Sequence, residues 1–228
     1  MINLFKKIYY EKYSKKSYSI SAVDLVIDRL FSKIKKGIYV DIGCNHPIKY
    51  NNTYLLYKRG WDGINIDLDK KSIIQFNKLR KKDTNINTLV TAKDDEEKLF
   101  YFYHERSAIN TISKDLADSR TTRPKKILKL KGKTINTIIE STRYKNKKIN
   151  LISIDIENYE YEALENFDFQ KYKVDVIVAE ITDIKQKNLE IYKQNIDYIL
   201  NSNLYKLLIR NNYKLINWVN ADLIFFRK

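Results

Sequence analysis

The chain contains few of the residues that break or cross-link a polypeptide. Its 228 residues include only 5 glycines, 2 prolines and 1 cysteine. Because Cys44 stands alone, no disulfide can form within the chain, which is consistent with a reducing compartment. We therefore expect a cytoplasmic protein.

The sequence also lacks a long apolar run. The longest, at 174–181 and 223–226, are far shorter than the roughly 20 residues that a membrane-spanning helix needs. Residues 1–16 carry too many charges to serve as the apolar core of a secretory signal. We expect no transmembrane segment, but the basic surface leaves peripheral contact with acidic head groups open.

Acidic residues are fewer than basic ones: the chain has 28 acidic and 43 basic residues, which gives a formal net charge of +15. Such an excess suggests nucleic-acid binding. However, lysine, asparagine, isoleucine and tyrosine are all abundant together, which is typical of an AT-rich coding sequence that adds lysine throughout the surface. We therefore do not expect nucleic acid as a partner. A hydrophobic content of 43% indicates a globular chain with a full core.

Two regions are expected from the pattern along the chain. Residues 1–37 form an N-terminal arm followed by an amphipathic helix that begins near Ser21 and ends near Gly37. Its mixed charges favour packing on a sheet over binding to a membrane. Residues 38–228 form the main domain.

Strands alternate with helices through this domain, which predicts a mostly parallel sheet with right-handed crossovers. We expect seven strands in the sheet and an antiparallel hairpin at the C-terminus. The predicted strands are 38–42, 64–68, 86–91, 99–103, 149–156, 174–181, 205–210 and 215–226. The predicted helices are 52–59, 70–80, 134–142, 159–167 and 187–201, and residues 105–133 are predicted to form a loop or lid with some helix.

The most informative segment is 38–67, in which one apolar run ends at Asp41-Ile42-Gly43 and a second ends at Asp67. This spacing is typical of the first half of a nucleotide-binding α/β unit, with Asp67 placed to bind ribose hydroxyls. A pyrophosphate would need more glycines here, so an NAD-dependent enzyme is disfavoured. A sulfonium ligand with an amino-acid tail needs less clearance, and Asp41 can attract its cationic groups. We therefore predict S-adenosylmethionine as the ligand.

Three blocks together resemble the FkbM-type methyltransferase family: DIGCNHP with NTYLLYKRGWDGINID, then INLISIDIENYE, then VIVAEI. The similarity covers about residues 38–183, with a fainter echo at 222–226. It implies a Rossmann-like class I methyltransferase that transfers a methyl group to oxygen, often on a sugar. Asn158 stands where the family usually has glycine, but asparagine tolerates left-handed backbone angles.

The candidate site residues follow from the strand ends and from this resemblance. For the cofactor they are Asp41, Gly43, Cys44, Asn45, Asp67 and Leu68. For catalysis they are Asp155, Glu157, Glu180 and His46, and for the acceptor Asn52, Thr53 and His104. Asp94 and Asp95 are candidates for an adenine contact that the sequence does not assign. We predict no metal site, although the catalytic carboxylates could hold a divalent ion.

The predicted function is S-adenosylmethionine-dependent O-methylation of a sugar hydroxyl in a glycan or glycosylated small molecule. Two alternatives remain open. One is an RNA methyltransferase, which the positive charge favours, although no NPPY-type tetrad is present. The other is a Rossmann-like binding module that has lost catalysis, which Asn158 and the scarce glycines favour.

Overall fold

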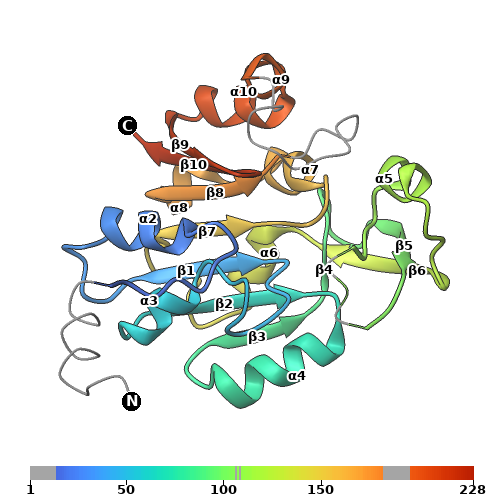
Figure 1. Cartoon of the computed structure of the whole chain (residues 1–228), viewed down its shortest axis with the longest axis horizontal. Helices are drawn as coiled ribbons and strands as arrows, with labels where there is room; N and C mark the ends of the chain where they lie inside the picture. The colour runs from blue at the N-terminus through green and yellow to red at the C-terminus, as the bar shows by residue number, and fades with distance from the viewer. Residues whose placement is uncertain (1–13, 106, 108, 182–195) are drawn as a thin grey trace, which may run out of the picture.

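In the computed structural model, residues 14–105, 107, 109–181 and 196–228 are described. Figure 1 shows a twisted central sheet with helices on both faces and a smaller sheet that projects from one end. The central strands are β1 (Ile38–Ile42), β2 (Asp62–Asp67), β3 (Thr84–Asn87), β7 (Leu151–Ile154), β8 (Val176–Glu180), β9 (Tyr213–Val219) and β10 (Asp222–Arg227).

The central sheet has the order β3-β2-β1-β7-β8-β10-β9. Strands β1, β2, β3, β7 and β8 run parallel, and β10 is antiparallel to both β8 and β9. The chain therefore winds outward from β1 in one direction and then crosses over to β7 for the other half. This arrangement confirms the predicted seven-stranded, Rossmann-like sheet with a C-terminal antiparallel hairpin.

Helices cover both faces because the buried strands are apolar on both sides. The helices are α2 (Val23–Leu30), α3 (Tyr54–Lys58), α4 (Lys70–Leu79), α6 (Ile135–Glu140), α7 (Glu160–Glu165), α8 (Phe169–Tyr172), α9 (Ile196–Asn201) and α10 (Asn203–Arg210). One core joins α6, α7, α8 and α10 to the sheet. A second core joins α2 to Trp61 and to the other face of the sheet. The apolar stripe of α2 is thus core, as predicted, although the helix is shorter than its periodicity suggested. None of the described helices is long and apolar enough to cross a membrane.

The projecting unit is a three-stranded sheet of order β4-β6-β5 with one short helix. Its elements are β4 (Leu89–Val90), β5 (Glu97–Phe102), α5 (Lys114–Ser119) and β6 (Lys126–Lys133). Strands β5 and β6 pair antiparallel along their length, whereas β4 pairs only with the end of β6, at Gly132 and Lys133.

Three predicted elements differ from the structure. Residues 205–210 lie in helix α10 and not in a strand, because Leu204, Leu207 and Leu208 bury one face and the Ser202 hydroxyl accepts the Tyr205 N–H at 3.1 Å. The C-terminal hairpin is therefore formed by β9 and β10. The predicted strand 86–91 is divided between two sheets, and the predicted lid 105–133 contains both α5 and β6. The predicted helix 187–201 begins outside the described residues, and only α9 of it is seen. Most of the N-terminal arm also lies outside them.

Candidate active site

A pocket opens at the carboxyl ends of β1, β2 and β7, where parallel sheets of this kind bind their ligands. The space among its lining residues amounts to about 1040 Å³, counting the part that is open to solvent. Its walls come from the turn after β1, the end of β2, the small sheet, the described residues 107 and 110–112 of segment 107–112, and the turn after β7. The prediction that the site would lie at these strand ends agrees with this position.

The turn after β1 depends on Gly43. Its φ of 76° lies in the left-handed region, and a Cβ there would lie 1.8 Å from the carbonyl oxygen of Asp155. The Gly43 N–H donates to Ile66 O at 2.9 Å, which ties the turn to β2. Glycine at this position therefore lets the β1 and β7 turns approach each other and close the floor of the pocket.

Asp67 lies at the end of β2 and lines the pocket. Its Oδ2 accepts the Asn45 N–H and its Oδ1 accepts the Asp69 N–H, both at 2.7 Å. Burial raises the pKa of Asp67 to about 6, and these two N–H groups oppose that shift. Each carboxylate oxygen keeps a further lone pair, so Asp67 is fixed in place and can still accept hydrogen bonds from a diol.

Beside Asp67 the pocket is apolar. The end of β2 and the small sheet contribute Ile66, Leu68, Leu89, Val90 and Phe100 to its lining. This wall suits a flat, weakly polar ring such as adenine. Asp94 and Asp95 do not line the pocket: Asp94 accepts the Thr134 N–H at 2.8 Å and the Thr137 hydroxyl at 2.6 Å instead.

Three of the predicted catalytic carboxylates come together at the ends of β7 and β8. Oxygen atoms of Asp155, Glu157 and Glu180 all lie within 4.8 Å of one another. The charge of Asp155, followed by burial, raises the pKa of Glu180 well above its usual range. The Asp155 side chain is exposed to the space of the pocket, yet the surrounding protein reduces its solvation and raises its pKa as well. We infer that Glu180 holds the proton of this pair and donates it to Asp155.

Glu157 lies in the turn after β7 and lines the pocket. Burial, together with the charge of Asp155, raises its pKa to about 7, although Arg120 opposes the shift. Arg120 Nη2 lies 2.7 Å from Glu157 Oε2, and the Thr111 hydroxyl donates to Glu157 O at 3.1 Å. Thus the predicted lid region contacts this turn. Glu157 and Asn158 both have positive φ, 58° and 69°, so asparagine is compatible with the turn where the family has glycine.

Two further acids, which sequence reasoning missed, complete this acidic group. Glu160 is buried, accepts the Ile156 N–H at 2.8 Å, and has a pKa raised by burial to about 8. Asp222 pairs in register with Glu180, and burial raises its pKa to about 7. The only signal for Asp222 was the family echo at 222–226. The sequence also did not identify which residues of segment 107–112 line the pocket, because nothing in it marks the residues that face inward.

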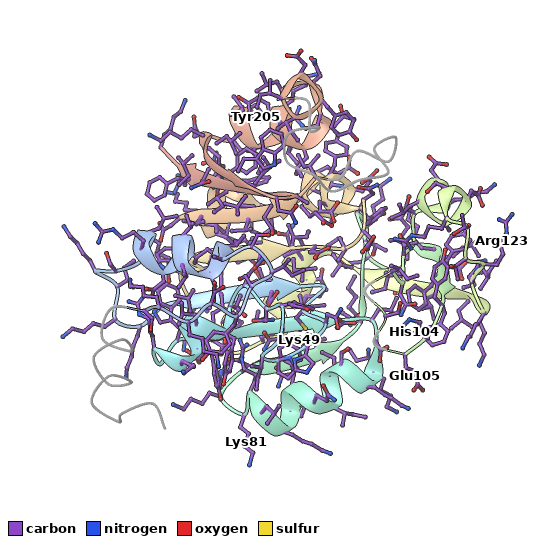
Figure 2. The ribbon with its side chains drawn as sticks, viewed as in Figure 1. Lys49, Lys81, His104, Glu105, Arg123 and Tyr205 are labelled. Carbon is purple, nitrogen blue, oxygen red and sulfur yellow. The ribbon has the colours of Figure 1, made fainter. Side chains whose placement is uncertain are left out.

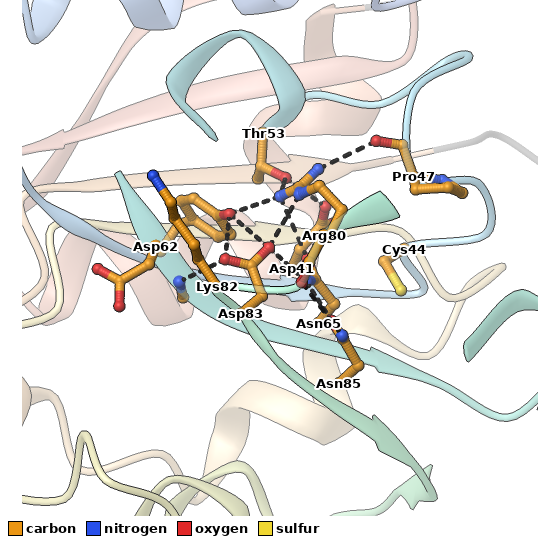
Figure 3. Close-up of polar contacts among 12 residues, drawn as sticks. Asp41, Cys44, Pro47, Thr53, Asp62, Asn65, Arg80, Lys82, Asp83 and Asn85 are labelled. Atoms are coloured by element: carbon orange, nitrogen blue, oxygen red, sulfur yellow. Dashed lines mark hydrogen bonds and ion pairs between the residues drawn. The ribbon is translucent and has the colours of Figure 1, made fainter. Parts of the chain in front are cut away.

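Asp41 and Thr53 do not line the pocket, contrary to the expectation for a cofactor contact and an acceptor contact. The Thr53 hydroxyl and the Asn51 amide donate to Asp41 Oδ2 at 2.7 and 3.0 Å. Both residues belong to a buried polar cluster around Arg80, which is shown in Figure 3. Arg80 donates to Pro47 O at 3.2 Å and forms an ion pair with Asp83 at 2.8 Å. Through the hydrogen bond to Pro47 O, this cluster fixes the loop after β1 in place.

Asn45 lines the pocket, whereas Cys44, His46, Asn52 and His104 lie outside its lining. Cys44 is buried against Ile73 and Phe76. His46 Nδ1 accepts the N–H groups of residues 48 and 49 at 3.1 and 2.9 Å, so this nitrogen is not available as a base.

Asn52 lies beside the acidic group, where its hydrogen bond to Asp222 opposes the rise in the pKa of that acid. It accepts the Ser19 hydroxyl at 2.7 Å and donates to Ser153 Oγ at 3.3 Å. His104 is exposed, and Figure 2 shows it on the outside of the molecule, near Glu105. Neither residue is among those that line the pocket.

Residues 41–207 match the family described as the methyltransferase FkbM domain. The chain belongs to this family. The matched residues include the whole pocket lining except Ile20 and the whole acidic group except Asp222. Among proteins of curated function, none matches the chain by sequence.

Solved structures of low identity resemble the fold of this FkbM protein. A TehB-like SAM-dependent methyltransferase from Corynebacterium glutamicum is 13% identical, with a TM-score of 0.46 over 98% of this chain and 95% of that one. An O-methyltransferase from Bacillus cereus in complex with SAH is 12% identical, with a TM-score of 0.44 over 98% and 88%. Monomeric WbdD is 10% identical, with a TM-score of 0.46 over 99% and 45%.

The FkbM protein is a methyltransferase that uses S-adenosylmethionine. The residues of the pocket fit this cofactor: Asp67 offers oxygens for a ribose diol, the apolar wall suits adenine, and the carboxylates suit a cation. Among the described residues, one group of three carboxylates is close enough to share a metal ion, namely Asp155, Glu157 and Glu180. Ion pairing to Arg120 and the proton shared with Glu180 already stabilise these acids without an ion.

Proposed function

We propose that this FkbM methyltransferase transfers the methyl group to a sugar hydroxyl in a glycan or a glycosylated small molecule. The observation that carries the proposal is the placement of Asp155 and Glu157 in the pocket wall, beside the Asp67 turn. A hydroxyl must lose its proton as it is methylated, so a carboxylate within hydrogen-bond reach assists the reaction.

Glu157 is our candidate for the general base. Its pKa of about 7 lies near the pH at which such an enzyme works, so it is partly ionised and can also hold a proton. Because Oε2 is bonded to Arg120, the hydroxyl proton would be taken up at Oε1. Bound S-adenosylmethionine supplies an electrophilic methyl group on a sulfonium. The protein then contributes alignment, with the reacting atoms held about 3 to 3.5 Å apart.

The polar lining supports a neutral, hydroxyl-rich acceptor. Among the described lining residues are four acids, Asp67, Asp69, Asp155 and Glu157, and neither lysine nor arginine. Carboxylates accept hydrogen bonds from hydroxyl groups but repel phosphates. The basic charge of the whole chain therefore does not extend to the pocket wall, which favours a sugar over an RNA acceptor.

Segment 107–112 is the part of the structure that we propose to contact the acceptor, in place of Asn52, Thr53 and His104. Ser107, Asn110 and Thr111 line the pocket and carry hydroxyl and amide groups suited to sugar hydroxyls. We propose that the region around this segment closes over the acceptor, as the sequence suggested.

The test is a comparison of extracts from cells with and without the gene, in which glycans, lipids and RNA are searched by mass spectrometry for a methyl group. The purified enzyme is then assayed on the glycan that differs. Glu157→Gln should lower turnover strongly while the affinity for S-adenosylmethionine changes little, and Glu165→Gln, at an exposed position, serves as the control. A methyl group found only in RNA would overturn the sugar assignment. Full turnover in Glu157→Gln would show that Glu157 is not the base.

A further inference from the structure

The small sheet carries an uninterrupted block of positive charge. Between residues 119 and 139 there is no acid, and seven basic residues occur. They are Arg120, Arg123, Lys125, Lys126, Lys129, Lys131 and Lys133. Another acid-free stretch, 198–221, contains only three basic residues, so this block stands apart from the general lysine excess.

Most of the block lies on an exposed strand. We call residues 123–131 the basic segment. Within it, residues 125–129, at the start of β6, are all exposed. Figure 1 shows β6 in the unit that projects from the central sheet, and Figure 2 shows Arg123 at its outer end. Among the described residues, Lys129 of this strand forms an ion pair with Glu97 at 2.5 Å, and Lys131 lies in register with the same acid. The positive charge of the basic segment is therefore mostly uncompensated by neighbouring acids among the described residues.

Large aliphatic side chains are exposed among these lysines. Ile127 is 55% exposed, Leu128 is 41% exposed and Leu99, on the neighbouring strand, is 48% exposed. Because Leu99 is in register with Lys129, Ile127 is its diagonal neighbour on the same face of the sheet. Successive residues of a strand point to opposite faces, so Leu128 lies on the other face. The projection thus presents aliphatic groups on both faces, bordered by lysine.

We propose that the basic segment docks this protein onto a membrane surface that contains anionic phospholipid. Lysine ammonium groups near such a surface are attracted to its head groups, and each adds about a five-fold gain in partitioning. Ile127 and Leu128 would leave water by entering the interface between head groups and acyl chains. This inference goes beyond the proposed methyl transfer and does not depend on which hydroxyl is methylated.

The same features disfavour two other occupants. A nucleic acid would bind the lysines, but exposed isoleucine and leucine offer neither a stacking surface nor hydrogen bonds to bases. A second copy could pair with the edge of β6, since within the described residues only β4 pairs with that edge, at Gly132 and Lys133. Such pairing would bring the lysines of the two copies together, and lysine on an edge strand opposes it.

The experiment measures co-flotation of the full chain with vesicles of phosphatidylcholine alone and with an equimolar mixture of phosphatidylcholine and phosphatidylglycerol. The test variant is Lys125→Gln/Lys126→Gln/Lys131→Gln. Its matched control is Lys33→Gln/Lys35→Gln/Lys36→Gln, which removes the same charge from exposed positions after α2. A second pair compares Ile127→Gln/Leu128→Gln with Ile74→Gln/Leu79→Gln, at positions of α4 that are 43% and 50% exposed. Thermal unfolding of each variant establishes that it is folded.

We expect the wild type to bind the mixed vesicles and to leave the neutral vesicles largely free. The lysine triple in the basic segment should lower the partition coefficient at least about ten-fold, and the aliphatic pair should lower it several-fold. Both controls should stay close to the wild type. The proposal fails if the wild type does not bind the mixed vesicles, or if the two lysine triples lose binding equally. It also fails if the aliphatic pair has no effect and single-stranded RNA competes with the vesicles, because the segment would then be a polyanion site.

Discussion

Replacing Arg80 with methionine should destabilise the fold more than any exposed Arg-to-Met change. The side chains of Arg80 and Asp83 are both 0% exposed, and they form an ion pair at 2.8 Å. Arg80 also donates to Tyr39 Oη at 2.6 Å, to Thr53 Oγ1 at 3.1 Å and to Pro47 O at 3.2 Å. Methionine would fill much of the space but would leave the Asp83 charge buried without its cation (Figure 3).

Removing one partner of a buried ion pair typically costs about 3 to 5 kcal/mol. Small proteins lose about 1 to 3 kcal/mol of stability per molar urea, and the slope increases with chain length. The midpoint of urea unfolding should therefore fall by about 1 to 2 M. The loop after β1 should loosen as well, because Arg80 holds its Pro47 carbonyl, so the affinity for S-adenosylmethionine should drop in the same variant.

Arg143→Met is the matched control. Arg143 forms an ion pair with Asp62 at 2.9 Å, but its side chain is 53% exposed, and such surface pairs contribute about 0 to 1 kcal/mol. A double-mutant cycle with Asp83→Asn separates the pair from the rest of the cluster. The double variant should be more stable than the sum of the single losses predicts, since neither charge is then left alone. If Arg80→Met unfolds at the urea concentration of Arg143→Met, the buried pair does not stabilise the loop as we argue.

Three further predictions concern the pocket. Asp67→Asn should weaken binding of S-adenosylmethionine by about 1 to 3 kcal/mol in calorimetry, the cost of unpaired polar groups, and unchanged affinity would refute the ribose contact. Gly43→Ala should abolish binding or folding, measured by calorimetry and circular dichroism, because its Cβ would lie 1.8 Å from a carbonyl oxygen; normal binding would contradict this. The raised pKa of Glu160, about 8, means that the folded state binds its proton more tightly than the unfolded chain does. Its contribution to stability is therefore full below about pH 4.5 and lost as the pH rises through 8, so urea midpoints of Glu160→Gln should depend less on pH than those of the wild type over this range.

The parts of the fold that the sequence predicted are those with a local signal. The turn at Gly43 and the end of β2 at Asp67 were predicted because an apolar run stopped at a glycine or an acid, and these residues indeed line the pocket. Helix α10 was missed because residues 205–210 were predicted to form a strand, although Ser202 caps the helix in the structure. What distinguishes a helix from a strand here is the packing of Leu204, Leu207 and Leu208 in the core against the sheet, and the sequence alone does not show this contact.

The side-chain partners of the predicted site residues could not be predicted in the same way. Asp41 looked like a ligand for a cation because it ends β1 beside the turn. The structure gives it a different cation, Arg80, which is 39 positions later in the chain and reaches the loop through the end of α4. Nothing in the sequence between α4 and β3 marks Arg80 as buried, because arginine is usually exposed. In the sequence, a charged residue that is buried and paired cannot be distinguished from the many charged residues that are exposed.

The electrostatics of the pocket follow from topology and not from composition. The chain carries a formal charge of +15, yet acids collect where β7 and β8 end and where β10 begins. Parallel strands bring their carboxyl ends to one edge, and the antiparallel β10 brings its first residue, Asp222, to the same edge. Burial, followed by the charge of Asp155, then raises the pKa values of Glu157 and Asp222 to about 7. Carboxylates that are partly protonated near pH 7 can accept or donate a proton, whereas a fully ionised surface acid is a weaker base and has no proton to donate. The basic exterior and the acidic pocket wall are therefore separate properties, and the net charge of the chain does not predict the charge of the pocket.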